Sequence, residues 1–180
     1  MTEPSDILDR AADAALALAA ERPWRQVSLR DIAERAGTPL PDLYASATSK
    51  WSLLGRLSDR FDRAALETAA TPSEDLHDRL FDATMARVEA MEPHREALTA
   101  IARADTPVML APHLPRTARA ILEAAGIDAT PPRLLAMTAV WARTVQVWRD
   151  DEGALNRTMA EIDKRLKQMR GQLKRIGAGF

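Results

Sequence analysis

Apolar residues recur every three or four positions along most of the chain, which is the spacing of amphipathic helices. Alanine and leucine are abundant, β-branched residues are sparse, and aromatic residues make up only 4% of the sequence. These residue types favour helices over strands. The pattern therefore predicts an all-α fold.

The first predicted helix spans residues 6–21, with Ser5 as its N-cap and Pro23 as its breaker. A second break falls at residues 71–73, where threonine, proline and serine favour a turn and mark a candidate domain boundary. The remaining apolar periodicity predicts further helices at about 50–69, 74–91, 93–104, 115–125, 131–150 and 153–175.

Two short helices between these segments predict a helix-turn-helix. Ser28, three residues before Asp31, forms a capping-box pattern that marks the start of a helix. Gly37 suits the left-handed residue that follows a helix end. Thr38 is then expected to cap a short third helix whose first residue is Pro39, a position that needs no N–H group. In such a motif the last helix lies in the DNA major groove.

Residues 6–61 resemble the N-terminal domain of TetR-family transcriptional regulators. The resemblance rests on the run ILDRAADAALALAAERPWRQVSLRDIAERAG, on the Leu43–Tyr44 pair and on SKWSLL, which begins with Ser49 and Lys50. It implies a homodimer whose N-terminal domains bind palindromic operator DNA, and a helical C-terminal domain whose small ligand releases the DNA, as in a repressor. The implied divisions are a helix-turn-helix DNA-binding domain at 1–50, a connecting helix at 51–70, and a helical ligand-binding and dimerisation domain at 71–180.

The resemblance also implies individual phosphate contacts. By position, Ser28 would cap the second helix and present backbone amides to a phosphate. Tyr44 and Lys50 would donate to phosphates on either side of the groove. Each residue also has a plainer interpretation, in which Ser28 is only a helix cap, Tyr44 only packs, and Lys50 is a solvated cation.

Base contacts are expected from Thr38, and from Leu40 or Pro41 against thymine methyl groups. Asp42 is placed to accept a hydrogen bond from a cytosine amino group. The full set of predicted DNA-binding residues is Ser28, Arg30, Thr38, Pro39, Leu40, Pro41, Asp42, Tyr44, Ser49 and Lys50.

The predicted recognition helix is poor in positive charge. Residues 38–49 contain no lysine or arginine, and alanine and serine occupy positions 45–47, where the family usually has a basic or histidine residue and then an aromatic. Over residues 28–50, three basic residues are balanced by three acidic ones. Because each neutralised phosphate adds affinity at low salt, we expect weak, strongly salt-limited DNA binding.

The C-terminal part is expected to hold the ligand. Apolar residues at helical spacing from Leu134 to Trp148 are interpreted either as core packing or, with nearby methionines, as the wall of a pocket for a small apolar ligand. Arg143 and Gln146 on that helix either reach solvent or orient an acidic or carbonyl group. The predicted pocket residues are Met85, Met91, Met109, Met137, Trp141, Arg143, Val145 and Trp148.

The last predicted helix is both apolar and basic. Residues 164–180 carry a net charge of +6 beside an apolar stripe, which fits either a dimer helix or an interfacial helix that contacts anionic lipid. The run WRDDEGALNRTMAEIDKRL loosely resembles TetR-fold proteins that have lost DNA binding and act as lipid-binding accessory factors in ubiquinone biosynthesis, which is the alternative function. The stripe consists of Ile162, Leu166, Met169, Leu173 and Ile176.

Composition and motif content exclude several classes of protein and site. The 180 residues carry a net charge of −1 and no cysteine, so disulfides and thiolate metal sites are excluded and a cytoplasmic location is expected. No signal-like N-terminus and no apolar run of ~18 residues is present. His77, His94 and His113 lack metal-ligand spacing, and no phosphate-binding loop occurs. We therefore expect no enzyme activity, no metal and no cofactor.

Overall fold

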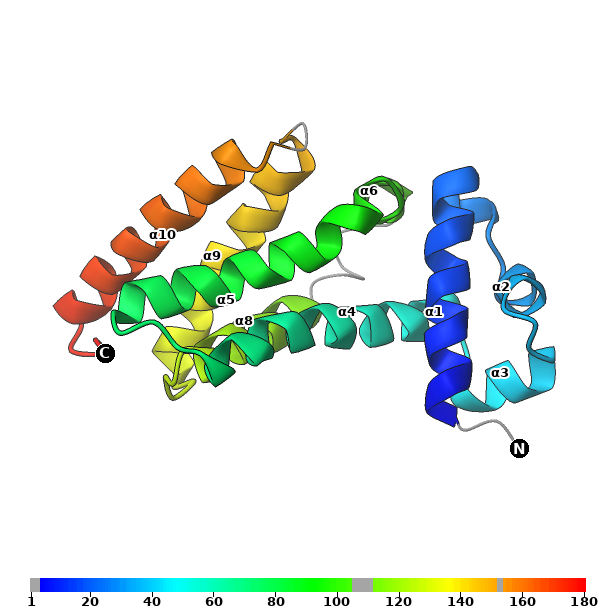
Figure 1. The fold of residues 1–180 in the computed structure, drawn as a ribbon, viewed down its shortest axis with the longest axis horizontal. Coiled ribbons are helices and arrows are strands. Elements are labelled where there is room, and N and C mark those ends of the chain that lie inside the picture. Colours follow the sequence, from blue (N-terminus) through cyan, green and yellow to red (C-terminus); the bar gives the residue numbers. More distant parts are fainter. Residues whose placement is uncertain (1–3, 105–111, 152–153) are drawn as a thin grey trace. The chain divides into compact units, whose positions relative to one another are not determined.

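The structure is a computed structural model that describes residues 4–104, 112–151 and 154–180. Every regular element in these ranges is helical, which confirms the all-α prediction (Figure 1). The elements are α1 (Pro4–Glu21), η1 (Trp24–Gln26), α2 (Leu29–Arg35), α3 (Leu40–Ser46), α4 (Lys50–Glu67), η2 (Thr68–Ala70), α5 (Leu76–Met91), η3 (Glu92–His94), α6 (Arg95–Ala104), α8 (His113–Ala124), α9 (Pro131–Arg149) and α10 (Asn156–Arg175).

The chain divides into two compact units. Unit 1 comprises residues 1–60 and 94–110, and unit 2 comprises residues 61–93 and 111–180. In unit 1, α1 packs against α2, α3 and α6. The packing of α6 on α1 differs from the sequence-based division, which assigned all residues after 70 to the C-terminal domain. Sequence periodicity shows that α6 has an apolar face but does not show which helix covers it.

Small residues bring the helices of unit 1 close together. Three alanines of α1 are fully buried, and short side chains of this kind allow neighbouring backbones to approach. Larger side chains fill the space between α1, η1 and the helix-turn-helix. The fully buried large residues of this unit are Trp24, Ile32, Leu43, Leu53 and Leu57.

The turn between α2 and α3 confirms one prediction and corrects another. Gly37 has φ +60°, the left-handed conformation expected after the helix. Its N–H donates to the Glu34 carbonyl, and the Thr38 N–H donates to the Ala33 carbonyl, which together form a Schellman motif. The prediction that Thr38 caps α3 is therefore wrong: Thr38 completes the end of α2, and Pro39 is the N-cap of α3.

Two further predictions about helix ends are also wrong. Because α1 begins at Pro4, Ser5 lies inside the helix and is not its N-cap. Ile176 follows the last residue of α10 and is 68% exposed, so it does not continue the buried stripe of that helix. The other four members of the stripe are buried, as predicted.

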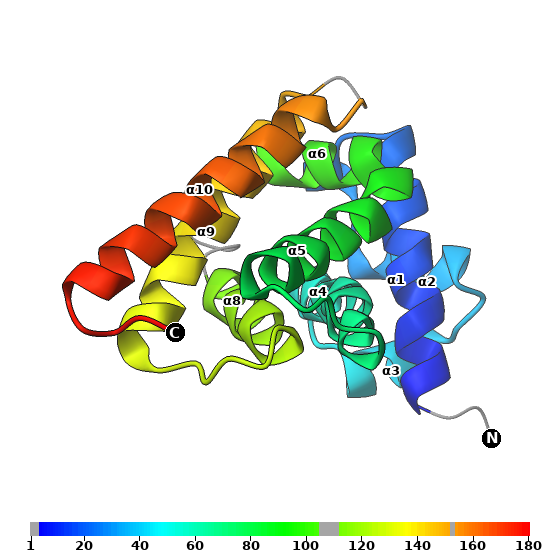
Figure 2. The ribbon, with the colours of Figure 1, turned by 60° about the vertical axis from the view of Figure 1, so that its left-hand side comes forward.

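Unit 2 is a four-helix arrangement in which α5 contacts α8 and α10, and α9 contacts the same two helices from the other side (Figure 2). The side of α9 that faces this core carries Met137, Trp141, Thr144 and Trp148, spaced by three or four residues. None of the described helices is long and apolar enough to cross a membrane.

Replacing Gly37 with alanine is expected to destabilise the protein by about 1 kcal/mol, because an L residue is strained at this positive φ. Gly171 offers a matched control, since it lies within α10 and an added Cβ there meets no atom within 4 Å. Gly171→Ala should stabilise the protein by roughly 0.5–1 kcal/mol. Urea unfolding of both variants measures these changes, and a destabilisation of equal size in both would contradict the prediction.

Candidate functional site

The exposed face of α3 is the surface offered by the helix-turn-helix. Pro39, Pro41, Asp42 and Tyr44 are exposed, and Leu40 is half-buried. Tyr44 is 57% exposed, so its phenol projects from the helix and does not pack into the core. Leu43, one residue earlier, is fully buried and anchors the opposite face. The short helix therefore presents a polar tyrosine and an acidic residue, and no cation of its own.

Ser28 is the N-cap of α2 and forms the predicted capping box with Asp31. The Asp31 backbone N–H donates to Ser28 Oγ at 3.2 Å, and the Ser28 N–H donates to the Asp31 carboxylate at 2.7 Å. Ser28 Oγ also donates to the same carboxylate oxygen, and Arg22 pairs with it at 3.0 Å. Hydrogen bonds from Ser28, with Arg22, lower the pKa of Asp31 to about 2. The Ser28 side chain is thus engaged in the cap.

Lys50 binds protein groups on the segment before α2. Its Nζ donates to the Trp24 carbonyl at 2.7 Å and to the Val27 carbonyl at 3.0 Å. The same ammonium lies 4.6 Å from the centre of the Trp24 ring and 5.7 Å from that of Trp51. These rings attract a cation through their π faces. Lys50 is therefore a positioning residue of the helix-turn-helix, and the interpretation as a freely solvated lysine is wrong.

Two other predicted DNA-binding residues are engaged within the protein. Thr38 is only 6% exposed, and its hydroxyl accepts from Arg10 and donates to the Ala36 carbonyl. Ser49 Oγ accepts from the Ser52 N–H at 3.3 Å at the start of α4. Of the predicted set, the exposed or half-exposed members without such bonds are Arg30, Pro39, Leu40, Pro41, Asp42 and Tyr44.

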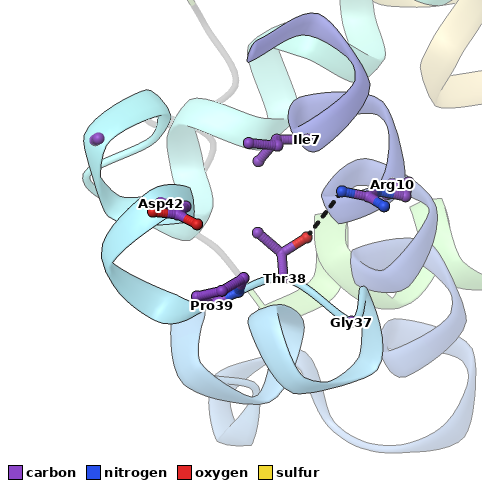
Figure 3. A pocket seen from close by; sticks show the side chains of 7 residues that line it. Ile7, Arg10, Gly37, Thr38, Pro39 and Asp42 are labelled. Atoms are coloured by element: carbon purple, nitrogen blue, oxygen red, sulfur yellow. Dashed lines mark hydrogen bonds between the residues drawn. The ribbon is translucent and has the colours of Figure 1, made fainter. Parts of the chain in front are cut away.

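A crevice of about 450 Å³ lies beside α3, between the N-terminal half of α1 and the turn (Figure 3). Arg10 and Ile7 come from α1, and Asp42 faces them from α3. The guanidinium of Arg10 is hydrogen-bonded to Thr38 at 3.4 Å and weakly paired with Asp6 at 3.9 Å. Sequence reasoning missed Arg10 because it lies 28 residues before the turn that it contacts. The lining residues are Ile7, Arg10, Gly37, Thr38, Pro39, Asp42 and Ala45.

Most cations of residues 4–60 are paired with carboxylates. Arg35 makes two hydrogen bonds to Glu21, of 2.7 and 2.6 Å, and Arg56 makes two to Asp9, of 2.9 and 2.8 Å. These arginines hold the pKa values of both carboxyls below their ordinary values, chiefly through the hydrogen bonds. Little unpaired positive charge therefore remains on this part of the chain for a nucleic acid. Among the eight basic residues of this range, Arg10, Arg22, Arg35, Arg56 and Arg60 pair with acids, Arg25 and Lys50 bind backbone carbonyls, and Arg30 is exposed with no such bond.

The predicted ligand-pocket residues do not share one environment. Arg143 has a 42% exposed side chain that donates to Glu161 of α10 at 3.1 Å and to Gln146 at 2.7 Å, so it faces the α9–α10 surface. Val145 is half-buried, and Met109 lies outside the described residues. The buried members are Met85, Met91, Met137, Trp141 and Trp148.

Two of the buried residues surround an arginine that sequence reasoning missed. Arg87 of α5 is 5% exposed, lies 4.4 Å from the centre of the Trp141 ring, and donates to Met91 Sδ at 2.8 Å. Its Nε donates to Asp62 Oδ1 at 2.6 Å. A signal was available, because Arg87 falls four residues before Met91 on the stripe that α5 buries. Among the described residues, no three His, Cys, Asp or Glu side chains converge as metal ligands do.

Comparison with known proteins agrees with this arrangement. Residues 12–57 match the family model for bacterial regulatory proteins of the tetR family. The fold resembles a TetR transcriptional regulator from Rhodococcus sp. RHA1, with 20% identity, a TM-score of 0.71 and coverage of 91% of this chain and 95% of that one. A TetR transcriptional regulator from Nitrosomonas europaea ATCC 19718 has 23% identity, a TM-score of 0.72 and coverage of 90% and 97%.

A third solved structure, the dihydroxyacetone kinase operon activator DhaS, has 10% identity, a TM-score of 0.59 and coverage of 93% of this chain and 96% of that one. The search of curated proteins found no match. The comparisons therefore confirm the predicted TetR-like fold, with a TetR-type N-terminal domain followed by a helical domain.

Replacing Asp31 with asparagine should lower the melting temperature at pH 7, because the charged cap of α2 is lost. The ordinary pKa is 3.8 and the folded value is about 2, so this stabilisation is present above pH 3.8 and lost as the pH falls through 2. The difference between wild type and variant should therefore shrink between pH 4 and 2. Thermal unfolding by circular dichroism measures it, with exposed Glu34→Gln on the same helix as control; a difference independent of pH would refute the prediction.

Proposed function

We propose that this chain, whose N-terminal domain is of the TetR family and whose fold is that of TetR regulators, is a transcriptional regulator that binds operator DNA. The observation that carries the proposal is the family match over residues 12–57, which contain an α3 whose outer face is exposed. In this proposal α2 crosses the DNA backbone and α3 lies in the major groove.

Few groups are available for DNA contacts, and they divide by role. Tyr44 donates to a phosphate, while Leu40, Pro41 and Asp42 contact base edges. Arg30, exposed on α2, neutralises another phosphate. Arg10 supplies a second cation beside the turn, because its side chain is 43% exposed and its pairing with Asp6 is long. Binding with so few phosphate contacts is weak and strongly salt-limited.

In this proposal, unit 2 controls DNA binding. A small apolar ligand binds among the helices of unit 2 and releases the DNA, so that the protein acts as a repressor. The support is the resemblance of the N-terminal domain and the adaptable methionines and tryptophans in the core of this unit. The choice of repressor over activator rests on the resemblance alone. The fold does not decide it, because one protein of similar fold is named an operon activator.

We further propose a homodimer formed through α9. The side of α9 that faces neither α8 nor α10 carries Leu135, which is 74% exposed, followed by Ala139 and Ala142. This stretch of small and apolar residues can pack against its own copy across a two-fold axis. Two N-terminal domains are thereby available for the two halves of a palindromic operator.

The second candidate function is that of a lipid-binding accessory protein that no longer binds DNA. The observation in its favour is the end of α10, where exposed Ile176 and Phe180 lie close in sequence to Lys174 and Arg175. Basic and apolar side chains together suit contact with anionic lipid. This candidate requires binding to anionic vesicles and equal affinity for operator and scrambled DNA.

Arg30→Ala should weaken DNA binding and reduce the slope of log affinity against log salt by about 0.9 per subunit, because one phosphate contact is lost. Lys50→Met should leave that slope unchanged and instead destabilise the fold by roughly 1–3 kcal/mol, because hydrogen bonds from a charged group are lost. Fluorescence anisotropy on DNA upstream of the gene, with scrambled DNA as control, measures the slope.

The salt slopes of the two variants and the affinity of the wild type for the two DNAs test different statements. A slope reduced by Lys50→Met as much as by Arg30→Ala would show that Lys50 contacts a phosphate and refute its assignment as only a positioning residue. Equal affinity of the wild type for both DNAs would refute the proposed regulator. Nanomolar affinity at physiological salt would contradict the expected weakness.

Leu135→Glu should convert the dimer to a monomer at micromolar concentration, because two buried carboxylates would face each other without partners. Leu66→Glu is the control, since Leu66 is also exposed but lies on α4. Sedimentation equilibrium measures the mass of each variant. A wild-type monomer, or a Leu135→Glu variant that remains dimeric, would overturn the proposed interface.

A further inference from the structure

The crevice of about 450 Å³ between α1 and α3 is large enough to hold a small molecule. Its volume lies within the range of about 300–1,000 Å³ that is usual for ligand sites. Figure 3 shows Arg10 on one side of this space and Asp42 on the other, with Ile7 and Pro39 on the remaining walls. All of the lining residues belong to unit 1, so one compact body forms the whole crevice. Opposite charges and apolar surface therefore surround a single space.

The guanidinium of Arg10 is held loosely by the protein. Its Nη2 donates to the Thr38 hydroxyl at 3.4 Å, and Asp6 lies 3.9 Å from the same nitrogen, beyond hydrogen-bond distance. Nε and Nη1 make no hydrogen bond to any described residue. The buried Thr38 hydroxyl donates to the Ala36 carbonyl, which fixes its orientation toward Arg10. The guanidinium is thus positioned by Thr38 and keeps donors for an external anion.

The carboxylate of Asp42 supplies the opposite charge. Asp42 is exposed, and its carboxylate has no hydrogen bond or ion pair with any described residue. A carboxylate of this kind accepts strong hydrogen bonds from a cationic donor. The position of Asp42 on the crevice wall is fixed by α3, because the next residue, Leu43, is fully buried and anchors that helix.

The two charges limit the chemistry of a ligand. An anion that binds Arg10 alone is repelled by Asp42, and a cation that binds Asp42 alone is repelled by Arg10. A molecule with one acidic and one basic group pairs with both residues, so its charges complement those of the crevice. Its carboxylate makes charge-assisted hydrogen bonds with Arg10 where Asp6 makes none. The hydrocarbon part of such a molecule suits the apolar lining residues Ile7 and Ala45.

We propose that this crevice binds a small zwitterion whose carboxylate pairs with Arg10 and whose ammonium group pairs with Asp42. The site is separate from the ligand site proposed in unit 2. Two exposed lining residues, Pro39 and Asp42, belong to the predicted DNA-binding set, so a bound zwitterion and operator DNA exclude each other. This competition rests on the proposed regulator, whereas binding of the zwitterion does not.

The test uses 6-aminohexanoate and its isomer L-leucine, which carry the same two charged groups at a long and a short separation. Hexanoate and hexylamine each lack one of the two charges and serve as comparison ligands. Isothermal titration of the full chain without DNA, at constant ionic strength, measures binding. At least one zwitterion should bind about threefold or more tightly than either singly charged ligand, because only a zwitterion forms both ion pairs.

Two variants should each remove one of these ion pairs. Asp42→Asn should bind the zwitterion only as tightly as it binds hexanoate, because the partner of the ammonium group is lost. Arg10→Met should bind it only as tightly as it binds hexylamine, because the partner of the carboxylate is lost. The controls Glu34→Gln and Arg63→Met neutralise exposed residues outside the crevice and should bind like the wild type.

Fluorescence anisotropy tests the competition with DNA. The zwitterion that binds should release labelled DNA from the wild type at concentrations near its dissociation constant. Because a zwitterion has no net charge and does not raise the ionic strength, this release is not an effect of salt.

Each outcome decides the proposal. No binding of either zwitterion at millimolar concentrations, equal binding of the singly charged ligands, or undiminished binding by Asp42→Asn would overturn it. If circular dichroism shows that Arg10→Met is unfolded, Asp42→Asn decides alone, because that exposed side chain has no bond to a described residue. Zwitterion binding by a protein that does not bind DNA would refute the proposed regulator but support this site, and DNA binding without zwitterion binding would do the reverse. DNA that stays bound when the crevice is occupied would refute the competition.

Discussion

The ammonium of Lys50 is the group on which the arrangement of the helix-turn-helix depends. It joins the first residue of α4 to the carbonyls of Trp24 and Val27, directly before the cap of α2. Two tryptophan rings lie around the same cation. An ammonium has three donors, and at least two of them bind carbonyls of the described residues. A DNA phosphate would therefore compete with the carbonyls of Trp24 and Val27 for the same ammonium. Lys50 cannot bind a phosphate strongly without weakening the contacts that position α2.

The same competition extends through unit 1. Its first helix is rich in alanine, which permits close packing but buries little apolar area. Bidentate arginine pairs then tie α1 to neighbouring segments, with Arg56 on Asp9 and Arg35 on Glu21. Cations committed to such pairs contribute less to an external phosphate. The low positive charge of the surface proposed to bind DNA thus follows from how this unit is held together as well as from its composition.

In unit 2 the ion pair formed by Arg87 and Asp62 is buried in the core. This core is apolar on most sides, and the buried Arg87 pairs there with Asp62, which also accepts a hydrogen bond from Thr117. A terminal nitrogen of Arg87 also donates to the Met91 sulfur. In unit 1 the paired cations lie at the surface and join helices, whereas in unit 2 the paired cation lies inside the core between α4 and α5.

The sequence by itself determined the local structure of this protein and the class of its N-terminal domain. Helix periodicity, the Ser28–Asp31 capping box and the glycine at position 37 act within a few residues, so their outcome can be derived from neighbouring positions. The absence of lysine and arginine from residues 38–49 was also readable from the sequence, because no distant residue changes the charge of the segment.

Only the tertiary structure decided which polar groups are engaged. Thr38 belongs to the end of α2 because its N–H meets the Ala33 carbonyl, and Lys50 is held by carbonyls more than twenty residues away. Arg87 and Asp62 lie 25 residues apart and on different helices. Periodicity reports that a residue faces inward but carries no information about the side chain it meets, since that depends on how separate helices pack.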